Sequence, residues 1–194
     1  MGRLRQAPCP GGAGTPLAIR LAMHRLPAAA LLATLACAAQ AAPSLSPDAA
    51  QLRAHVLALG DNGARPFGVL DKRRAHLWLF DARGAALGDT PVLLGWARGD
   101  DTVPGIGTRP IEQVRPHERT TPAGRFVTER GRNARREPVL WVDYEAAVSM
   151  HRVVTHTPSE RRLERLASAS PRDNRISYGC INLPAAFFDA TLQS

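Results

Sequence analysis

The apolar and polar residues of this chain alternate mostly in short runs, which predicts strands more often than helices. One exception comes first, where Ser46-Pro47-Asp48 opens an apolar-rich run that stops at Gly60. Serine caps the free N–H groups at a helix start and glycine adopts the left-handed conformation that ends a helix, so this run predicts one helix. Beyond it, apolar or alternating runs between polar turns predict strands at 67–70, 75–80, 90–95, 124–128, 139–142 and 146–151.

Two more helices are expected towards the end of the chain, over 158–168 and from Pro184 onward, because proline is favoured in the first helical turn. A short extended piece at 175–177 lies between them. Loops rich in glycine, proline and charge occupy 99–118 and 131–137, and a long loop in a compact domain often binds a ligand. The pattern as a whole predicts a strand-dominated domain of the mainly β, α+β class.

Residues 1–41 have the pattern of an export signal. Arginines precede an apolar run over 27–38, and Ala39-Gln40-Ala41 then supplies small residues at the positions that signal peptidase recognises. The run is too short for a transmembrane helix and prolines follow it. We therefore expect a cleaved signal peptide, with Met23 as a possible true start, no transmembrane span in the mature chain, and a location in the periplasm or cell envelope.

The remaining residues, 42–194, suit one domain, which we divide into an N-terminal helix and connection (42–66) and a main domain (67–194). The net charge of +8 includes four arginines of the predicted leader, so +4 remains after cleavage. The basic residues are nearly all arginine and are spread along the chain, which does not favour nucleic-acid binding. Arginines and leucines at 161–166 indicate a solvated helix face, or else attraction to an acidic envelope polymer.

Cys180 is the strongest candidate for chemistry. The leader contains Cys9 and Cys37, so the mature chain leaves Cys180 without a cysteine partner. A buried structural cysteine is the alternative, but the flanking Ser177-Tyr178-Gly179-Cys180-Ile181-Asn182 favours a site, because glycine admits a ligand to the backbone and successive N–H groups bind an oxyanion.

A nucleophilic cysteine needs a base, because a free thiol with a pKa of about 8.5 is mostly protonated at neutral pH. His151 ends the apolar run 146–151 and is expected at a strand end, where its side chain reaches a site; His156 is the alternative base. A zinc site is disfavoured, because the mature chain has no second cysteine and no His-x-x-x-His spacing. One cysteine paired with one histidine favours covalent acyl transfer.

Taken with His151 and the upstream Thr121-Pro122-Ala123-Gly124-Arg125-Phe126, the cysteine segment resembles the L,D-transpeptidase catalytic domain family of bacterial cell walls. The resemblance covers roughly 67–188. The family's signature usually reads Ser-His-Gly-Cys, an apolar residue and arginine, and its histidine usually precedes glycine. This chain differs at Tyr178, Asn182 and Arg152, and His156 lies closer to the usual spacing from the cysteine than His151 does.

The resemblance implies a mixed, mostly antiparallel β-sandwich-like fold with peripheral helices and an enzyme of peptidoglycan biosynthesis and cell wall organisation. His151 would deprotonate Cys180, which would attack a peptidoglycan stem peptide and form a thioester while the N–H groups of Gly179 and Cys180 stabilise the oxyanion. An amine of a second stem would complete transpeptidation. The implied substrate pocket comprises Ser177, Tyr178, Asn182 and Arg152, and no metal or organic cofactor is implied.

Two other functions are open at this level: an L,D-carboxypeptidase or other envelope amide hydrolase that uses the same pair, and a catalytically silent envelope-binding module. The sequence predicts neither the donor and acceptor peptides nor the oligomeric state. Family members usually continue into another extended segment after the helix that follows the cysteine, so the end at Ser194 indicates either a dispensable strand or a truncated domain.

Overall fold

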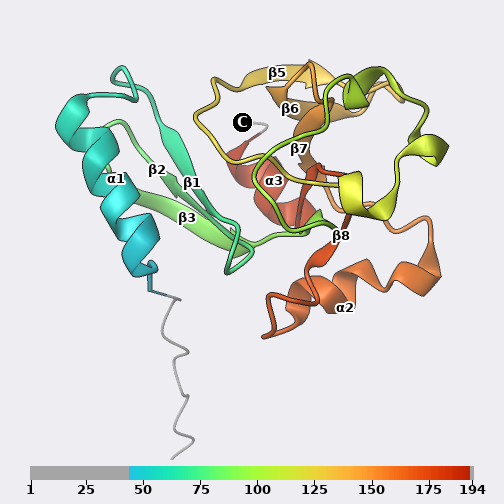
Figure 1. Cartoon of the computed structure of the whole chain (residues 1–194). Helices are drawn as coiled ribbons and strands as arrows, with labels where there is room; N and C mark the ends of the chain where they lie inside the picture. The colour runs from blue at the N-terminus through green and yellow to red at the C-terminus, as the bar shows by residue number, and fades with distance from the viewer. Residues whose placement is uncertain (1–43, 193–194) are drawn as a thin grey trace, which may run out of the picture. The chain divides into compact units, whose positions relative to one another are not determined.

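The computed structural model describes residues 44–192, which belong to one compact unit, Pro43–Ser194. The predicted leader and the Met23 start lie outside the described residues. The unit is a mixed α/β structure whose strands pair antiparallel except for β4 with β8 and β7 with β9 (Figure 1). The strands are β1 (Phe67–Asp71), β2 (His76–Phe80), β3 (Ala86–Pro91), β4 (Leu94–Gly95), β5 (Glu129–Arg132), β6 (Pro138–Asp143), β7 (Val148–Arg152), β8 (Arg175–Ser177) and β9 (Ile181–Leu183).

Helix α1 (Pro47–Leu59) begins and ends as its sequence predicts. The N–H of Ala49 donates to Ser46 Oγ over 3.1 Å, and Gly60 closes the helix in the left-handed conformation. Ser46 Oγ also donates to a carboxylate oxygen of Asp71 over 2.6 Å, which joins the helix start to the end of β1. Ala49 then packs with three residues of the β1–β2–β3 sheet, Val69, Trp78 and Phe80. The helix is therefore part of the packed unit.

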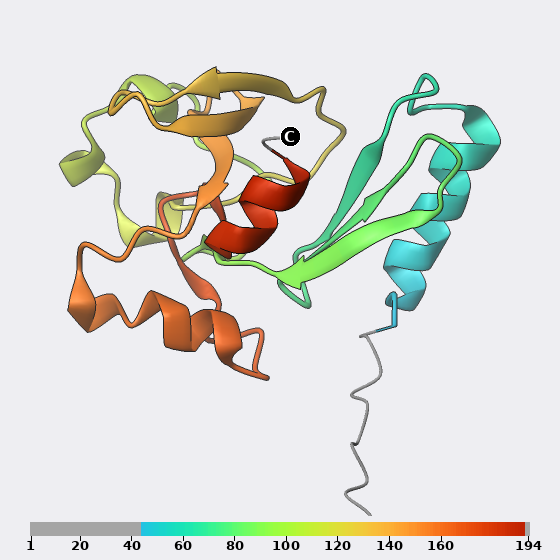
Figure 2. The same cartoon turned by 180° about the vertical axis from the view of Figure 1, so that it is seen from behind.

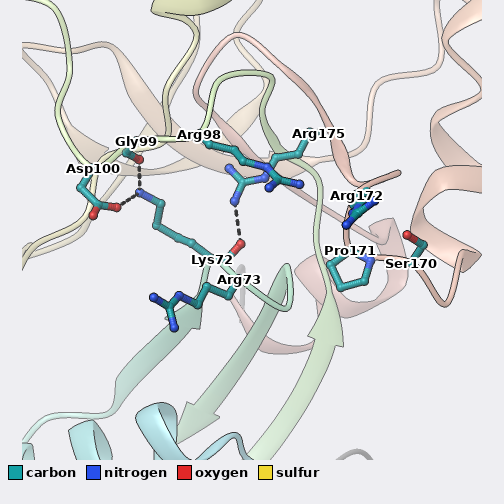
Figure 3. A pocket seen from close by; sticks show the side chains of 9 residues that line it. All are labelled: Lys72, Arg73, Arg98, Gly99, Asp100, Ser170, Pro171, Arg172 and Arg175. Carbon is teal, nitrogen blue, oxygen red and sulfur yellow. Dashed lines mark hydrogen bonds and ion pairs between the residues drawn. The ribbon is translucent and has the colours of Figure 1, made fainter.

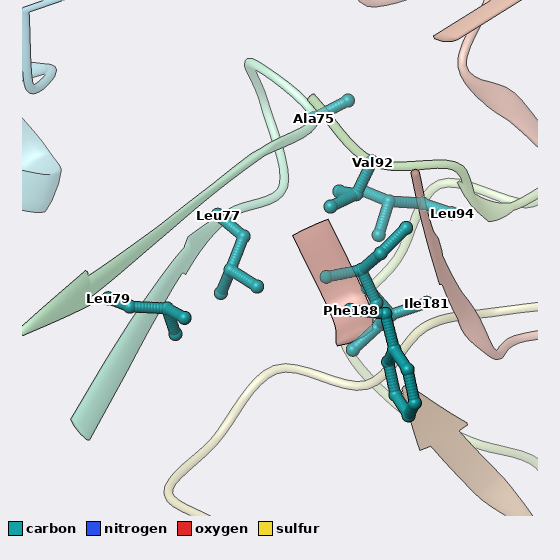
Figure 4. Close-up of a cluster of buried hydrophobic side chains, with 8 residues drawn as sticks. Ala75, Leu77, Leu79, Val92, Leu94, Ile181 and Phe188 are labelled. Carbon is teal, nitrogen blue, oxygen red and sulfur yellow. The ribbon is translucent and has the colours of Figure 1, made fainter. Parts of the chain in front are cut away.

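The main core joins the β1–β2–β3 sheet to β9 and α3 (Ala185–Thr191). Figure 2 shows α3 between β3 and β7, both of which it contacts. The core is formed by apolar side chains from β2 and the residue before it, from the segment after β3, from β4, and from β9 and α3 (Figure 4): Ala75, Leu77, Leu79, Val92, Leu94, Ile181, Leu183 and Phe188. The close packing of these buried side chains holds β9 in place. It thereby also holds the preceding segment, which carries Cys180.

The strand predicted at 124–128 is wrong, and the real strand, β5, follows it at 129–132 and extends into the start of the predicted 131–137 loop. Gly124 has φ +151°, and the Arg125 guanidinium bonds the Asp61 carboxylate, so this stretch follows an irregular path. Instead, β5 and β6 form a hairpin whose turn is closed by Asn133, because its side-chain oxygen accepts from the N–H groups of Arg135 and Glu137.

Other predicted elements are present but interrupted. The strand predicted at 90–95 is divided between β3, which ends at Pro91, and β4, because proline has no N–H to extend a ladder. The helix predicted at 158–168 is a 3-10 turn, η4 (Pro158–Glu160), and α2 (Arg162–Ala167), separated by Arg161 in the left-handed conformation. The predicted 99–118 loop contains three short 3-10 turns, η1 (Ile106–Thr108), η2 (Ile111–Gln113) and η3 (Pro116–Glu118).

Candidate active site

Strands β7 and β9 run parallel, with His151 opposite Asn182. Successive side chains of a strand point to opposite faces of the sheet, so Ser149 and His151 of β7 lie on one face. Cys180 and Asn182, two positions apart, lie beside them on that same face. The contacts agree: Ser149 Oγ lies 3.8 Å from Cys180 Sγ, and Asn182 Nδ2 lies 3.2 Å from His151 Nε2. The fold thus places Cys180 beside Ser149 and His151 beside Asn182, and the thiol and the imidazole are near enough to shift each other's pKa.

The Cys180 thiol is partly buried, and burial is the largest single influence on its pKa, which it raises. A hydrogen bond with His151 and the charge of that ring oppose burial, and the N–H and hydroxyl of Ser149 add to them. Together these interactions hold the pKa of Cys180 below its ordinary value. The site therefore favours the thiolate, the form of cysteine that acts as a nucleophile.

The interactions with Cys180 also shift the pKa of the His151 ring. Burial, again the largest influence, lowers its pKa, but the hydrogen bond and charge of Cys180 and the bond to the Arg152 carbonyl outweigh it, so the pKa of His151 is raised. Nδ1 lies 2.7 Å from the Arg152 carbonyl oxygen and therefore donates to it, which leaves Nε2 as the acceptor. A lowered thiol pKa beside a raised imidazole pKa favours a thiolate–imidazolium pair.

The orientation of His151 depends on a chain of contacts that the sequence did not predict. Asn182 is 1% exposed, and its Oδ1 accepts from Arg162 over 2.6 Å, so its NH₂ group faces His151 Nε2. The Arg162 guanidinium in turn donates to the Glu160 carboxylate over 2.6 Å. Arg162 therefore fixes which end of the Asn182 amide meets the histidine.

The turn that carries Cys180 is fixed by buried hydroxyl groups. Ser177 Oγ donates to the Cys180 carbonyl over 2.6 Å and accepts from the Gly179 N–H over 3.1 Å. Thr121 Oγ1 donates to the Gly179 carbonyl and accepts from the Gly95 N–H, each over 2.8 Å. Gly179 has φ +133°, and a Cβ there would lie 2.9 Å from the Thr120 carbonyl oxygen, so the position requires glycine.

These contacts correct the expected oxyanion donors. The N–H of Gly179 is already bonded to Ser177 Oγ, so it is not available as the second donor that we expected. The N–H of Cys180 is the remaining candidate.

The expected substrate pocket also needs correction. Ser177 and Asn182 are 2% and 1% exposed and bond within the protein. Arg152 lies on the opposite face of β7 from His151, where it pairs with Asp189 over 2.5 Å and lies over the Phe188 ring. Tyr178 alone of the four is exposed at the surface, with the Arg119 guanidinium 3.7 Å from its ring centroid.

His156, the alternative base, lies exposed in the loop after β7, where it forms no hydrogen bond within residues 44–192. The same described part of the chain holds no cluster of three histidine, cysteine or acidic side chains able to bind a metal. It also contains no helix of the length and apolarity that a membrane crossing requires.

Comparison with known proteins gives no relative: no family model, curated protein or solved structure matches the chain.

Proposed function

We propose that the protein is an exported cysteine acyltransferase of the L,D-transpeptidase type that acts on peptidoglycan stem peptides. The observation that carries the proposal is the pairing of Cys180 with His151, in which the thiol pKa is lowered and the imidazole pKa is raised. The two segments on which the resemblance rests also meet in space, since Thr121 donates to the Gly179 carbonyl. We extend the proposal to the fold: the mixed sheets would be a variant of the β-sandwich-like L,D-transpeptidase domain.

The first half of the proposed reaction acylates the cysteine. His151 Nε2 takes the Cys180 proton, and the thiolate attacks the amide carbonyl carbon that precedes the terminal D-alanine of a stem tetrapeptide. The N–H of Cys180 donates to the oxyanion of the tetrahedral intermediate. As the intermediate collapses, the C–N bond breaks, His151 Nε2–H gives its proton to the leaving amine, and a thioester remains on Cys180.

The second half returns the cysteine to its starting state. An amine of a second stem attacks the thioester carbonyl, His151 removes a proton from that amine, and the C–S bond breaks. The Cys180 thiolate then recovers a proton from His151. Water in place of the amine would give hydrolysis, so the same acyl-enzyme serves a transpeptidase and a carboxypeptidase.

The other site residues take positioning roles in this proposal. When His151 is neutral, its Nε2 accepts a hydrogen bond from Asn182, which orients the ring. Arg162 orients Asn182 in turn through a hydrogen bond to Oδ1. The Tyr178 ring is exposed and covered on one side by the Arg119 guanidinium, which supports a role for it in contacting the stem peptide. We propose no substrate role for Arg152, whose guanidinium pairs with Asp189 of α3.

Product analysis tests the proposal. The purified protein is incubated with a peptidoglycan tetrapeptide, with and without an acceptor stem, and the products are separated and weighed by liquid chromatography and mass spectrometry. A cross-linked dimer that Cys180→Ala fails to produce supports transfer, whereas tripeptide alone indicates the hydrolase. Release of neither product by a folded protein would refute an enzymatic role on this substrate.

A further inference from the structure

A second feature, separate from the cysteine site, is an open cavity of about 550 Å³ lined largely by cations (Figure 3). This volume lies in the range of small-ligand sites. Neither Cys180 nor His151 lines it. Its cationic side chains come from the β1–β2 turn, from the loop after β4, from the segment between α2 and β8, and from the first residue of β8: Lys72, Arg73, Arg98, Arg172 and Arg175.

Two of these five charges are already compensated. Lys72 Nζ lies 2.7 Å from a carboxylate oxygen of Asp100, which lines the same cavity, and 2.6 Å from the Gly99 carbonyl oxygen. Arg73 lies 3.6 Å from the carboxylate of Asp48, although both groups are largely exposed. The remaining three arginines have no carboxylate partner among the described residues.

Arg175 is the one of the three whose side chain is hydrogen-bonded within residues 44–192. It is half-buried, and it donates to the carbonyl oxygens of Lys72 over 2.6 Å and Gly95 over 3.4 Å. Carbonyl groups orient the guanidinium but do not neutralise it. Burial and the charge of Arg98 lower the pKa of Arg175 and outweigh the Asp100 carboxylate, which raises it, so the surroundings of Arg175 disfavour its positive charge.

Arg98 and Arg172 are the other two cavity arginines without a carboxylate partner. Neither forms a hydrogen bond or an ion pair with another residue of 44–192. In Figure 3 the guanidinium groups of Arg98 and Arg175 lie next to each other, and Arg172 comes from the segment after α2. Like-charged groups gathered around a cavity are stabilised by an anion that all of them contact.

We propose that this cavity binds a ligand carrying a phosphoryl group with at least two negative charges. Three guanidinium groups without a bonded carboxylate, from two segments of the chain, require several acceptor oxygens pointing in different directions, which a tetrahedral phosphoryl group or a pyrophosphate supplies. A single carboxylate would leave most of the positive charge uncompensated. The ligand is either a soluble phosphate compound or the headgroup of a phosphate-bearing lipid, since both present the same oxygens.

Titration calorimetry with inorganic pyrophosphate at low ionic strength tests the site. We expect saturable binding with a dissociation constant below about 1 mM, weakened by added salt because the cations are partly exposed. Arg98→Gln and Arg172→Gln are the informative variants, since neither side chain has a protein partner whose loss would disturb the fold. Each should weaken binding about fivefold or more, because a charge-assisted contact is lost.

Arg83→Gln is the matched control. It removes the same charge from an exposed arginine in the β2–β3 turn, outside the cavity, and should change the dissociation constant less than about twofold. Absence of saturable binding, or an equal loss in Arg83→Gln, would overturn the proposal. Sedimentation with phosphatidylcholine vesicles, with and without phosphatidic acid, separates the two sources of the phosphoryl group. If the protein binds the phosphatidic acid vesicles and pyrophosphate displaces it, the ligand is a lipid headgroup. If the protein binds pyrophosphate but not the vesicles, the ligand is a soluble compound.

Discussion

The contact between Arg162 and Asn182 gives the sharpest test of how the site is held. In Arg162→Met the apolar part of the side chain is kept, but the guanidinium that donates to Asn182 Oδ1 is lost. Because Asn182 is 1% exposed, water does not readily replace the missing donor. A buried acceptor left without a partner costs about 1–3 kcal/mol, so the free energy of unfolding should fall by roughly that amount.

The same change should alter the chemistry of Cys180. Without Arg162 the Asn182 amide is free to turn its oxygen towards His151 Nε2, and the ring loses its fixed position. The Arg162 charge lowers the pKa of His151, so its loss, together with an Asn182 oxygen that accepts from Nε2–H, should favour the imidazolium, and the pH midpoint of Cys180 alkylation by iodoacetamide should fall. Urea unfolding gives the stability, and alkylation rates followed by mass spectrometry over pH 5–10 give the reactivity.

Arg161→Met is the matched control, because Arg161 precedes Arg162 and pairs with the exposed Glu164. Exposed pairs contribute little, so the control should lose less than about 1 kcal/mol and should leave the alkylation profile unchanged. If Arg162→Met matched this control in both stability and alkylation, the chain from Arg162 through Asn182 to His151 would have no positioning role.

Three further predictions concern the same turn and pair. In His151→Gln the pH midpoint of Cys180 alkylation should rise, because the interaction that lowers the thiol pKa is lost while burial, which raises it, remains; an unchanged midpoint would contradict the pairing. Gly179→Ala should destabilise the protein by about 2 kcal/mol or more in urea, since its φ of +133° and the 2.9 Å approach to Thr120 both oppose a Cβ. Thr121→Val should cost about 1–3 kcal/mol in the same assay, with Thr121→Ser recovering most of it, because the hydroxyl serves two buried backbone groups.

Local signals in the sequence predicted much of the fold. Ser46 and Gly60 marked both ends of α1, and the apolar run before His151 predicted β7. The error at 124–128 arose because an apolar pair within a glycine-containing segment was taken as a strand, whereas pairing across the Asn133 turn decided where β5 lies. Tertiary contacts of this kind are not visible in a local pattern.

The sequence indicated the two residues at the centre of the candidate site but not the residues that surround them. Cys180 and His151 followed from residue type and position. Alternation along β7 would also have excluded Arg152 from the pocket, because a residue next to His151 faces the other side of the strand. Arg162 gave no such signal, since it reaches Asn182 from a helix 20 positions earlier in the chain. The cationic cavity was equally hidden, because its arginines come from separate segments.

The most direct test of the central claim is the intact mass of the protein after incubation with a carbapenem or a peptidoglycan tetrapeptide. We predict one covalent adduct on the wild-type chain, a much slower adduct in His151→Gln, and none in Cys180→Ala. A folded wild-type protein that gains no mass, or an adduct that persists in Cys180→Ala, would contradict an acylable nucleophile at Cys180 and would favour a catalytically silent envelope-binding protein.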